Sequence, residues 1–430
     1  MKRLTLIAVA ALSLTACQND QLADSSSPFE MKSTSAEYLT ASALPVTTVS
    51  GAITSNTTWS GVVELDGIVT VKNGATLTIQ PGTFIKAKPS ANNTATGVLV
   101  IAKTGKINAA GTEAQPIIFT SYKLLDGNED TTAAPGDFGG VVILGDAPTN
   151  TPFTKTIEGL SGPDFYYGGT NASHNGGTLK YVRIEFAGYD LLAPNSGNEI
   201  NGLTLGGVGN GTTLDHIQVS FGKDDSFEFF GGTVNASNLV SFAADDDNFD
   251  FDNGYTGTIT CALALADYNS THSLSGASPD SNGIELDNNA EGSSTTLLTH
   301  PVINNLTIIG AKNSSKGVLY ENGIHIRRHG RLTLNNAVVT GYPVGIKVEG
   351  TGSELSSASA YSTIQVHGFT TSVTGTGTAG IPAANLATGT PASLWGMSQP
   401  FFNEGGWNVS PRNCGNFQGL WTKYNFSIVE

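Results

Sequence analysis

An internal repeat is the feature of this sequence that most restricts its fold. Residues 224–232 read DDSFEFFGG and residues 246–254 read DDNFDFDNG, so one pattern returns after 22 residues. The same alternation of apolar and polar residues recurs, more weakly, at 203–205, 284–288, 324–328 and 346–349. A period near 22, stretched where loops are inserted, is typical of one turn of a parallel β-helix, in which each coil pairs with the next. We therefore expect an all-β solenoid.

A second series of apolar segments lies between the repeated ones. Its members are residues 181–186, 216–221, 238–242, 258–265, 305–309 and 332–339. Short apolar runs between residues 69 and 120 are separated by turn sequences such as Asn-Gly and Pro-Gly, which indicates the same architecture in the N-terminal third. The 52 glycines and the low charged fraction of 13% favour short strands and tight turns over helices. The sequence thus predicts two strand types that alternate along the chain.

Side-chain parity sorts the repeated strands into an inner and an outer set, because neighbouring residues of a strand face opposite sides. The predicted inward residues are Phe227, Phe229, Phe249, Phe251, Ile284, Leu286, Ile324, Ile326, Ile346 and Val348. The residues between them should point to solvent. They form one outward column of Glu228, Asp250, Glu285, His325 and Lys347, and a second column of Phe230, Asp252, Asp287, Arg327 and Glu349.

Four acidic residues of these columns, Asp250, Asp252, Glu285 and Asp287, are predicted to form a square of carboxylates. Neighbouring coils lie about 4.8 Å apart, and alternate side chains of a strand about 6.6 Å apart. Carboxylates at such spacing either take up protons or hold a cation. Ca²⁺ suits the site because it prefers oxygen ligands and tolerates irregular geometry, and further ligands are available from Asp246, Asp247, Asn253 and Asn288. The alternative is a solvated acidic face with asparagines hydrogen-bonded at a corner.

The N-terminus has the order of an export signal. Met1, Lys2 and Arg3 precede an apolar run at 4–14, which is too short to span a bilayer, and Leu-Thr-Ala-Cys follows at 14–17. This ending resembles the lipobox of bacterial lipoproteins. The resemblance implies cleavage after Ala16 and a diacylglycerol on Cys17. The residue after the cysteine is Gln18 and not Asp, which resembles lipoproteins sent to the outer membrane, with the face left open.

Residues 18–45 are rich in Ser, Thr, Ala and Asp and are expected to form a flexible tether. With Cys17 lipidated, Cys261 and Cys414 remain, and an oxidising compartment would permit a disulfide between them. Two separate thiols fit the sequence equally well. The net charge of −15 disfavours nucleic acid and anionic membrane surfaces as partners, and it favours divalent cations.

A family resemblance adds to this interpretation. Residues 105–121, GKINAAGTEAQPIIFTS, resemble the coil that opens many right-handed parallel β-helix proteins of the pectate-lyase-like superfamily. Together with the two Asp-Asp repeats, they resemble a group of bacterial surface lipoproteins with this fold, over residues 60–350. The resemblance implies the right hand of the helix. It does not select an activity, because the superfamily includes lyases, hydrolases, adhesins and passive surface proteins.

The same resemblance suggests a catalytic hypothesis. In calcium-dependent members, carboxylates bind Ca²⁺ against a uronate and an arginine or lysine removes a proton. Here Arg327 or Lys347 would be that base. The neighbouring Asp287 and Glu349 would raise the pKa of Arg327, so we prefer a salt-bridge ladder at this position. For hydrolysis, aspartates are available at 224–225 and 245–247, although Asp-rich turns also occur for local hydrogen-bonding reasons. Trp59, Tyr166 and Tyr167 are candidates for stacking on sugars or for filling the core.

These observations divide the chain into four parts. They are a signal peptide at 1–16, a lipidated tether at 17–45, a single-stranded right-handed parallel β-helix at 46–367, and a loop with a C-terminal capping segment at 368–430. The preferred function is a membrane-anchored envelope protein that binds a glycan or an envelope partner, stabilised by Ca²⁺. The alternative is a calcium-dependent uronate lyase or a glycoside hydrolase.

Overall fold

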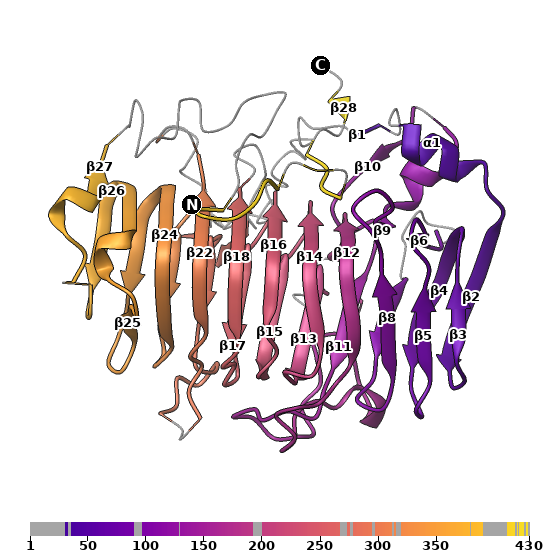
Figure 1. Cartoon of the computed structure of the whole chain (residues 1–430), viewed down its shortest axis with the longest axis horizontal. Coiled ribbons are helices and arrows are strands. Elements are labelled where there is room, and N and C mark those ends of the chain that lie inside the picture. Colours follow the sequence, from indigo (N-terminus) through magenta and orange to yellow (C-terminus); the bar gives the residue numbers. More distant parts are fainter. Residues whose placement is uncertain are drawn as a thin grey trace, which may run out of the picture.

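The computed structural model describes residues 31–32, 36–89, 97–128, 130–191, 200–266, 273–275, 278–294, 297–311, 314, 320–378, 380–389, 411–417, 419, 421–424 and 427–428. The chain winds into a right-handed parallel β-helix, a long rod of stacked coils (Figure 1). This confirms the predicted all-β solenoid. Within the described ranges, no helix has both the length and the apolar character needed to cross a membrane.

The first face of the rod carries the repeated Asp-Asp segments. It begins with the ends of β2 (Val46–Ile53) and β4 (Val62–Val71) and finishes with the ends of β24 (Arg331–Val348) and β26 (Ile364–Gly375). Between them lie β7 (Val98–Ile101), β11 (Gly140–Leu144), β13 (Leu203–Val208), β15 (Phe227–Gly232), β17 (Phe249–Asp252), β21 (Ile284–Leu286) and β23 (Asn322–Ile326).

The second and third faces are formed mainly by strands that run across both. The shared strands are β12 (Gly177–Glu185), β14 (Thr213–Ser220), β16 (Ala236–Phe242), β18 (Thr258–Leu265), β22 (Val302–Ile309) and β24. The second face also contains β3 (Thr57–Trp59), β5 (Thr76–Ile79), β8 (Lys106–Ala110) and β25 (Glu354–Ser356). The third face also contains β6 (Phe84–Ala87), β9 (Ile117–Thr120), β27 (Leu386–Thr388) and the starts of β2, β4 and β26.

Two strand types were expected, and the structure has three faces. The difference arises at one residue in each shared strand, which takes a left-handed backbone conformation and bends the strand. These residues are Tyr181, His216, Asn238, Cys261, Asn305 and Asn336, with φ between 50° and 64°. Asparagine and histidine adopt this conformation more readily than most residues, whereas Tyr and Cys do not favour it, so the sequence pattern did not reveal the corner.

The interior of the rod is a continuous apolar stack. All ten residues that parity placed inside are buried, as predicted. Phe227 stacks on Phe249 with ring centroids 5.2 Å apart, and Phe229 stacks on Phe251 at 5.1 Å. The 22-residue offset therefore corresponds to one coil, because these pairs lie on paired strands β15 and β17.

The tether was predicted to extend to residue 45, but its last part is structured. Helix α1 (Ala36–Ser42) packs against the outside of the third face and buries Tyr38. The Tyr38 hydroxyl donates to Glu185 at 2.7 Å, and Glu37 pairs with Arg183 at 2.9 Å. A sequence rich in Ser and Ala concealed a short amphipathic helix with two specific anchors.

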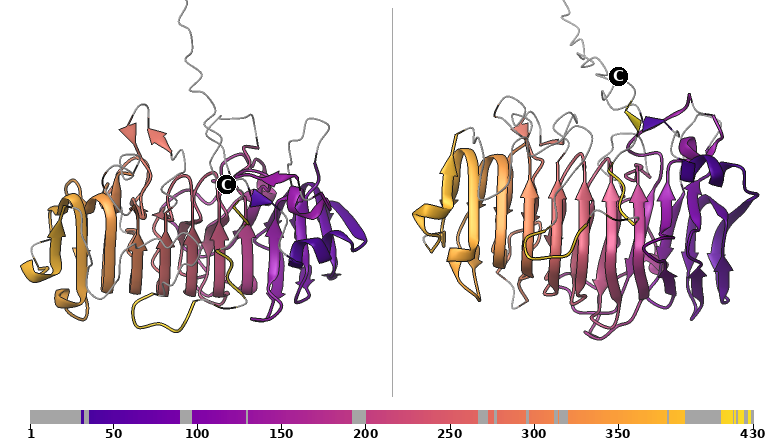
Figure 2. Two further views of the ribbon diagram at one scale, coloured as in Figure 1. Left: turned by 90° about the horizontal axis from the view of Figure 1, so that it is seen from above. Right: turned by 45° about the horizontal axis from the view of Figure 1, so that its top comes forward.

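The C-terminal part also differs from the expected loop and cap. Strands β26 and β27 continue the coils to residue 388. The described residues 411–424 run along the outside of the rod, where Lys423 bonds to Gln218 of β14 and Arg412 bonds to Thr307 of β22 (Figure 2). Cys17 and residues 390–410 of the predicted capping segment lie outside the described residues.

The smaller elements lie on the surface of the rod. Strand β1 (Met31–Lys32) pairs with β10 (Thr132–Ala133) on one side and with β28 (Ser427–Ile428) on the other, both antiparallel. Strands β19 (Leu274–Ser275) and β20 (Ser278–Pro279) form a hairpin. Short 3-10 turns are found at Tyr122–Leu125, Pro163–Phe165, Tyr361–Thr363 and Ala383–Asn385.

Candidate functional site

One outward column of the first face passes from apolar through acidic to basic residues. Strand register places Val100, Val142, Thr204, Glu228, Asp250, Glu285, His325 and Lys347 on successive coils. The part from Glu228 to Lys347 is the predicted column. Its exposure differs from the prediction, since Glu228 and His325 are only 6% and 3% exposed. Part of this face is therefore covered, and charged groups are buried in it.

Two arginines neutralise half of the predicted carboxylate square. Asp250 and Glu285 are neighbours on paired strands, as the register argument requires. Arg327 pairs with Glu285 and, through Nε, with Asp287 at 3.0 Å, and Arg328 also pairs with Asp287. The ion pair of Arg327 with Asp287 was expected from the sequence, whereas its ion pair with Glu285 was not.

Arg327 is poorly suited to remove a proton. Its ion pairs with Glu285 and Asp287 raise the pKa of the guanidinium despite partial burial, which stabilises the charged form. The preferred alternative, a salt-bridge ladder, matches the contact with Asp287. Glu349 does not belong to that ladder, because it pairs with Lys347 at 2.7 Å and His325 at 2.9 Å.

A further column, two residues before the first inward-pointing residue of each coil on the first face, forms a hydrogen-bonded ladder. Its members are Asn201, Asp225, Asp247, Asn282 and Asn322, and we call it the asparagine–aspartate ladder. In each step a side-chain oxygen accepts the backbone N–H of the next member. The N···O distances are 3.2 Å to Asn201, 2.8 Å to Asp225, 2.5 Å to Asp247 and 3.1 Å to Asn282. The ladder satisfies buried backbone donors at a corner of the rod.

The two aspartates bring more to the ladder than it requires. An amide oxygen accepts the backbone N–H equally well, as Asn201 and Asn282 show. Asp225 and Asp247 are buried, so each places a carboxylate where a neutral amide would cost less free energy. Among the described residues, no lysine or arginine forms an ion pair with either of them. At these two positions the ladder therefore carries a buried acid in place of an amide.

The ladder aspartates meet the outward column in a compact group of acids. One ligand oxygen each from Asp225, Glu228 and Asp250 lie within 4.8 Å of one another, and the same holds for Asp224, Asp225 and Asp246. We call these five residues the carboxylate cluster. Glu228 accepts a hydrogen bond from Asn201, whereas Oδ1 of Asp250 is buried with no hydrogen-bond partner among the described atoms. Of the predicted square, Asp250 alone belongs to this cluster.

Comparison with known proteins defines the family. A family model described as a pectate-lyase-like β-helix domain matches residues 51–392. The chain belongs to this family. A search of the solved structures found the catalytic domain of a GH87 alpha-1,3-glucanase in complex with tetrasaccharides, at 11% identity and a TM-score of 0.28. That match covers 80% of this chain, and the chain spans 63% of the other. A search of the curated proteins found no match.

In this pectate-lyase-like β-helix, burial dominates the electrostatics of the cluster. It raises the pKa of Asp225, Glu228 and Asp250 well above the ordinary range, and neighbouring carboxylates raise each further. Burial also raises the pKa of Asp246 to about 7 and that of Asp252 to about 6. At neutral pH the cluster must therefore hold protons or a cation.

The surroundings of the cluster come from inserted loops. Tyr167 is buried against Phe230, with ring centroids 6.0 Å apart, and covers the outer face just before the cluster. On the other side, Ser281 of the loop after β18 donates to the carbonyl of Asp246 at 2.8 Å. Trp59 and Tyr167 are both buried, so neither is available to stack on a sugar, and Tyr166 is half-buried.

We predict that the cation-free protein loses stability as the pH rises. An acid with a raised native pKa binds its proton more tightly in the folded state, so stability falls from the unfolded pKa up to the native one. For Asp246 this window runs from 3.8 to about 7. We expect a loss of about 2 kcal/mol or more across it in chelator, since one pKa unit corresponds to about 1.4 kcal/mol. Thermal melting at a series of pH values measures this.

A matched variant isolates the ladder. In Asp225→Asn/Asp247→Asn the amides still accept the backbone N–H groups but carry no charge, so the pH dependence should become shallower. Asn282→Asp should make it steeper. Equal slopes in all three proteins would contradict the assignment of the buried charge to this column.

Proposed function

We propose that this protein is a lipid-anchored protein of the bacterial outer membrane whose β-helix binds Ca²⁺ at the carboxylate cluster and presents the first face to a glycan. The observation that carries the proposal is the group of Asp225, Glu228 and Asp250 oxygens within 4.8 Å of one another, with Asp225 and Glu228 buried, Asp250 half-buried and no ion pair to them from a cationic side chain among the described residues. Carboxylates this close in a covered site favour a bound cation over mutual repulsion.

Ca²⁺ is the cation that the donor set fits best. The ligands are all oxygens, and Ca²⁺ binds six to eight of them at about 2.3–2.6 Å in variable geometry. One oxygen of Asp225 is used in the ladder, which leaves the other for a ligand. His325 is the nearest imidazole of the column, but it is two coils beyond Asp250 and is engaged by Glu349, which disfavours a transition metal.

Binding is favoured over catalysis by the spacing of the acids. In each of the two triads of the cluster, one oxygen from each of three acids lies within 4.8 Å of the others, and three converging oxygens suit the ligands of one ion. A glycosidase instead uses a pair of carboxyl groups that flank the scissile bond. The lyase alternative requires a base, and Arg327 is held charged by two carboxylates. Catalysis by the acids with raised pKa remains the competing hypothesis, and the glycan experiment below separates the two.

The glycan part of the proposal rests on the family and on the exposed side of the first face. Beyond the cluster, the outer columns present half-exposed Arg327, Lys347 and Glu349 together with Asp252, a row of hydrogen-bonding groups along the rod. Such a row suits the hydroxyl and carboxylate groups of an extended polysaccharide. An envelope protein with a complementary surface is the other partner that these columns would fit.

We predict that the full-length chain with Cys17→Ser binds Ca²⁺ saturably in isothermal titration and melts at a higher temperature with it. Glu228→Gln/Asp250→Asn should abolish both effects, because it removes two of the three converging ligands. The matched control is Asp287→Asn, which removes an arginine-paired carboxylate and should retain binding. If the control loses binding and the double variant keeps it, the ion belongs to the square predicted from sequence.

We predict calcium-dependent retention on an immobilised polysaccharide without cleavage. Neutral glucans and uronate polymers should be tested side by side, with Ca²⁺ and with chelator, and scored for bound protein and for released reducing ends. Retention that needs Ca²⁺ and leaves the polymer intact supports the binding function. Release of new chain ends that is lost in Asp225→Asn would replace it with hydrolysis.

The anchor is tested in cells. Cys17→Ser should move the protein from the membrane fraction to the soluble fraction, because the lipid supplies the proposed attachment. Cys261→Ser/Cys414→Ser should stay in the membrane fraction and serves as the control. A Cys17→Ser protein that remains in the membrane fraction would refute lipid anchoring.

A further inference from the structure

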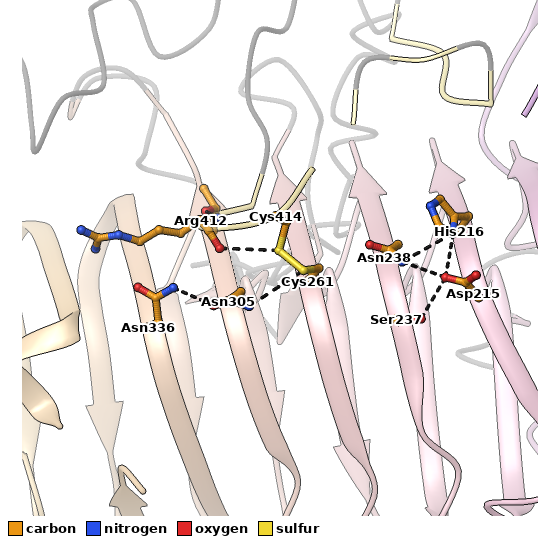
Figure 3. Close-up of a disulfide and its surroundings, with 10 residues drawn as sticks. Asp215, His216, Ser237, Asn238, Cys261, Asn305, Asn336, Arg412 and Cys414 are labelled. Atoms are coloured by element: carbon orange, nitrogen blue, oxygen red, sulfur yellow. Dashed lines mark hydrogen bonds and ion pairs between the residues drawn. A yellow bond between two sulfur atoms is a disulfide. The ribbon is translucent and has the colours of Figure 1, made fainter. Parts of the chain in front are cut away.

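The described residues between 411 and 424 form a strap along the third face, fixed at both of its ends. At one end Cys414 is bonded to Cys261 of β18 (Figure 3), and the backbone N–H of Arg412 donates to Thr307 at 3.1 Å. At the other end, the Gln218 side chain accepts from the N–H of Lys423 at 2.8 Å and donates to its carbonyl at 2.7 Å. The strap crosses several coils and joins none of them as a strand.

The strap covers an apolar surface on the outside of the rod. Phe417 and Trp421 are buried in a second apolar cluster, separate from the interior stack, together with Phe221, Phe242 and Leu263. The Trp421 ring packs edge-on against Tyr181 and His216, with centroids 6.3 Å and 5.1 Å away. Tyr424 packs edge-on against Phe242 at 5.6 Å. Without the strap, these aromatic faces would meet water.

Cys261 occupies a corner position that residues of other types occupy in the neighbouring coils. It is one of the left-handed corner residues, a column that continues with Asn305 and Asn336. Those two asparagines are linked by a hydrogen bond of 2.6 Å, and asparagine tolerates the left-handed conformation better than cysteine does. Cysteine therefore gains nothing for the corner itself at this position. Its contribution is the bond to Cys414.

Besides the disulfide, the strap is held by its buried aromatic rings and by the two hydrogen bonds of Lys423 with Gln218. Asn413, Gly415 and Asn416 beside Cys414 are exposed, and both bonded cysteines are half-buried. The disulfide thus lies beside exposed residues of the strap. Lys423 adds an ion pair with Glu37 of α1 at 3.0 Å, so the strap also contacts the N-terminal helix.

We propose that the Cys261–Cys414 disulfide is a redox-sensitive latch on this strap. With the bond formed, the strap covers the apolar surface around Phe221 and Phe242. A dithiol reductant opens it: one reductant thiolate attacks a protein sulfur to give a mixed disulfide, and its second thiolate releases the protein thiol. The protein gains two electrons and two protons as two cysteine thiols, and the reductant becomes its disulfide. The released strap then exposes this apolar surface to solvent, while the β-helix itself stays folded.

Hydrogen exchange tests the latch in the full-length chain with Cys17→Ser, whose only cysteines are Cys261 and Cys414. We expect dithiothreitol to accelerate amide exchange in the strap at least tenfold, with exchange in β14 and β16 unchanged. Cys261→Ser/Cys414→Ser should match the reduced protein with and without reductant. The result does not depend on calcium or glycan binding.

Two outcomes would overturn the proposal. Unchanged exchange in the strap after complete reduction, verified by thiol titration, would mean that Gln218 and the aromatic contacts hold it alone. Faster exchange in β14 and β16 together with the strap would mean that the bond staples the whole fold. Gln218→Ala with the disulfide intact gives the reference, since it should loosen only the end of the strap at Lys423.

Discussion

Hydrogen bonding between successive coils is the constraint on which the rest of this structure depends. Every coil uses the backbone of the previous one as its template, so a residue at one position of a coil lies over the same position of the next. Stacked Phe227 and Phe249 make this register favourable in the interior. The same register lines up the outer side chains, whether or not their charges suit one another. A functional site in this fold is therefore formed by side chains that stack in columns on successive coils.

The acidic columns show how the fold uses this property. At the corner before the first face, stacking requires only that each side chain accept one hydrogen bond, and Asn201 and Asn282 do so. Two aspartates in the middle of the ladder place charge beside Glu228 and Asp250, and burial makes that charge costly. On a later coil, Arg327 and Arg328 form ion pairs with Asp287 and neutralise its charge. The site is thus bounded on one side by aromatic cover at Tyr167 and on the other by arginine.

The sequence predicted the features that repetition encodes. The 22-residue offset identified the coil, parity identified the buried residues, and both together predicted the neighbours Asp250 and Glu285. Three features escaped prediction for physical reasons. The bend at Tyr181 or Cys261 depends on a backbone conformation that those residues do not favour. The partner of Glu285 depends on which way the long Arg327 side chain turns. The strap depends on contacts such as that of Lys423 with Gln218, 205 residues away, which no repeat records.

The pairing of β1 with β28 has a mechanical consequence. Met31 lies opposite Ile428, so the chain enters and leaves the rod at one place on its flank. Tension applied to the chain before residue 31 would shear β1 against β28 and β10. From β28 the load would pass down the C-terminal residues and through the disulfide into β18. The force would then act on β18, near the middle of the rod, as well as on the N-terminal coils. The coils would not unfold one after another from the N-terminal end.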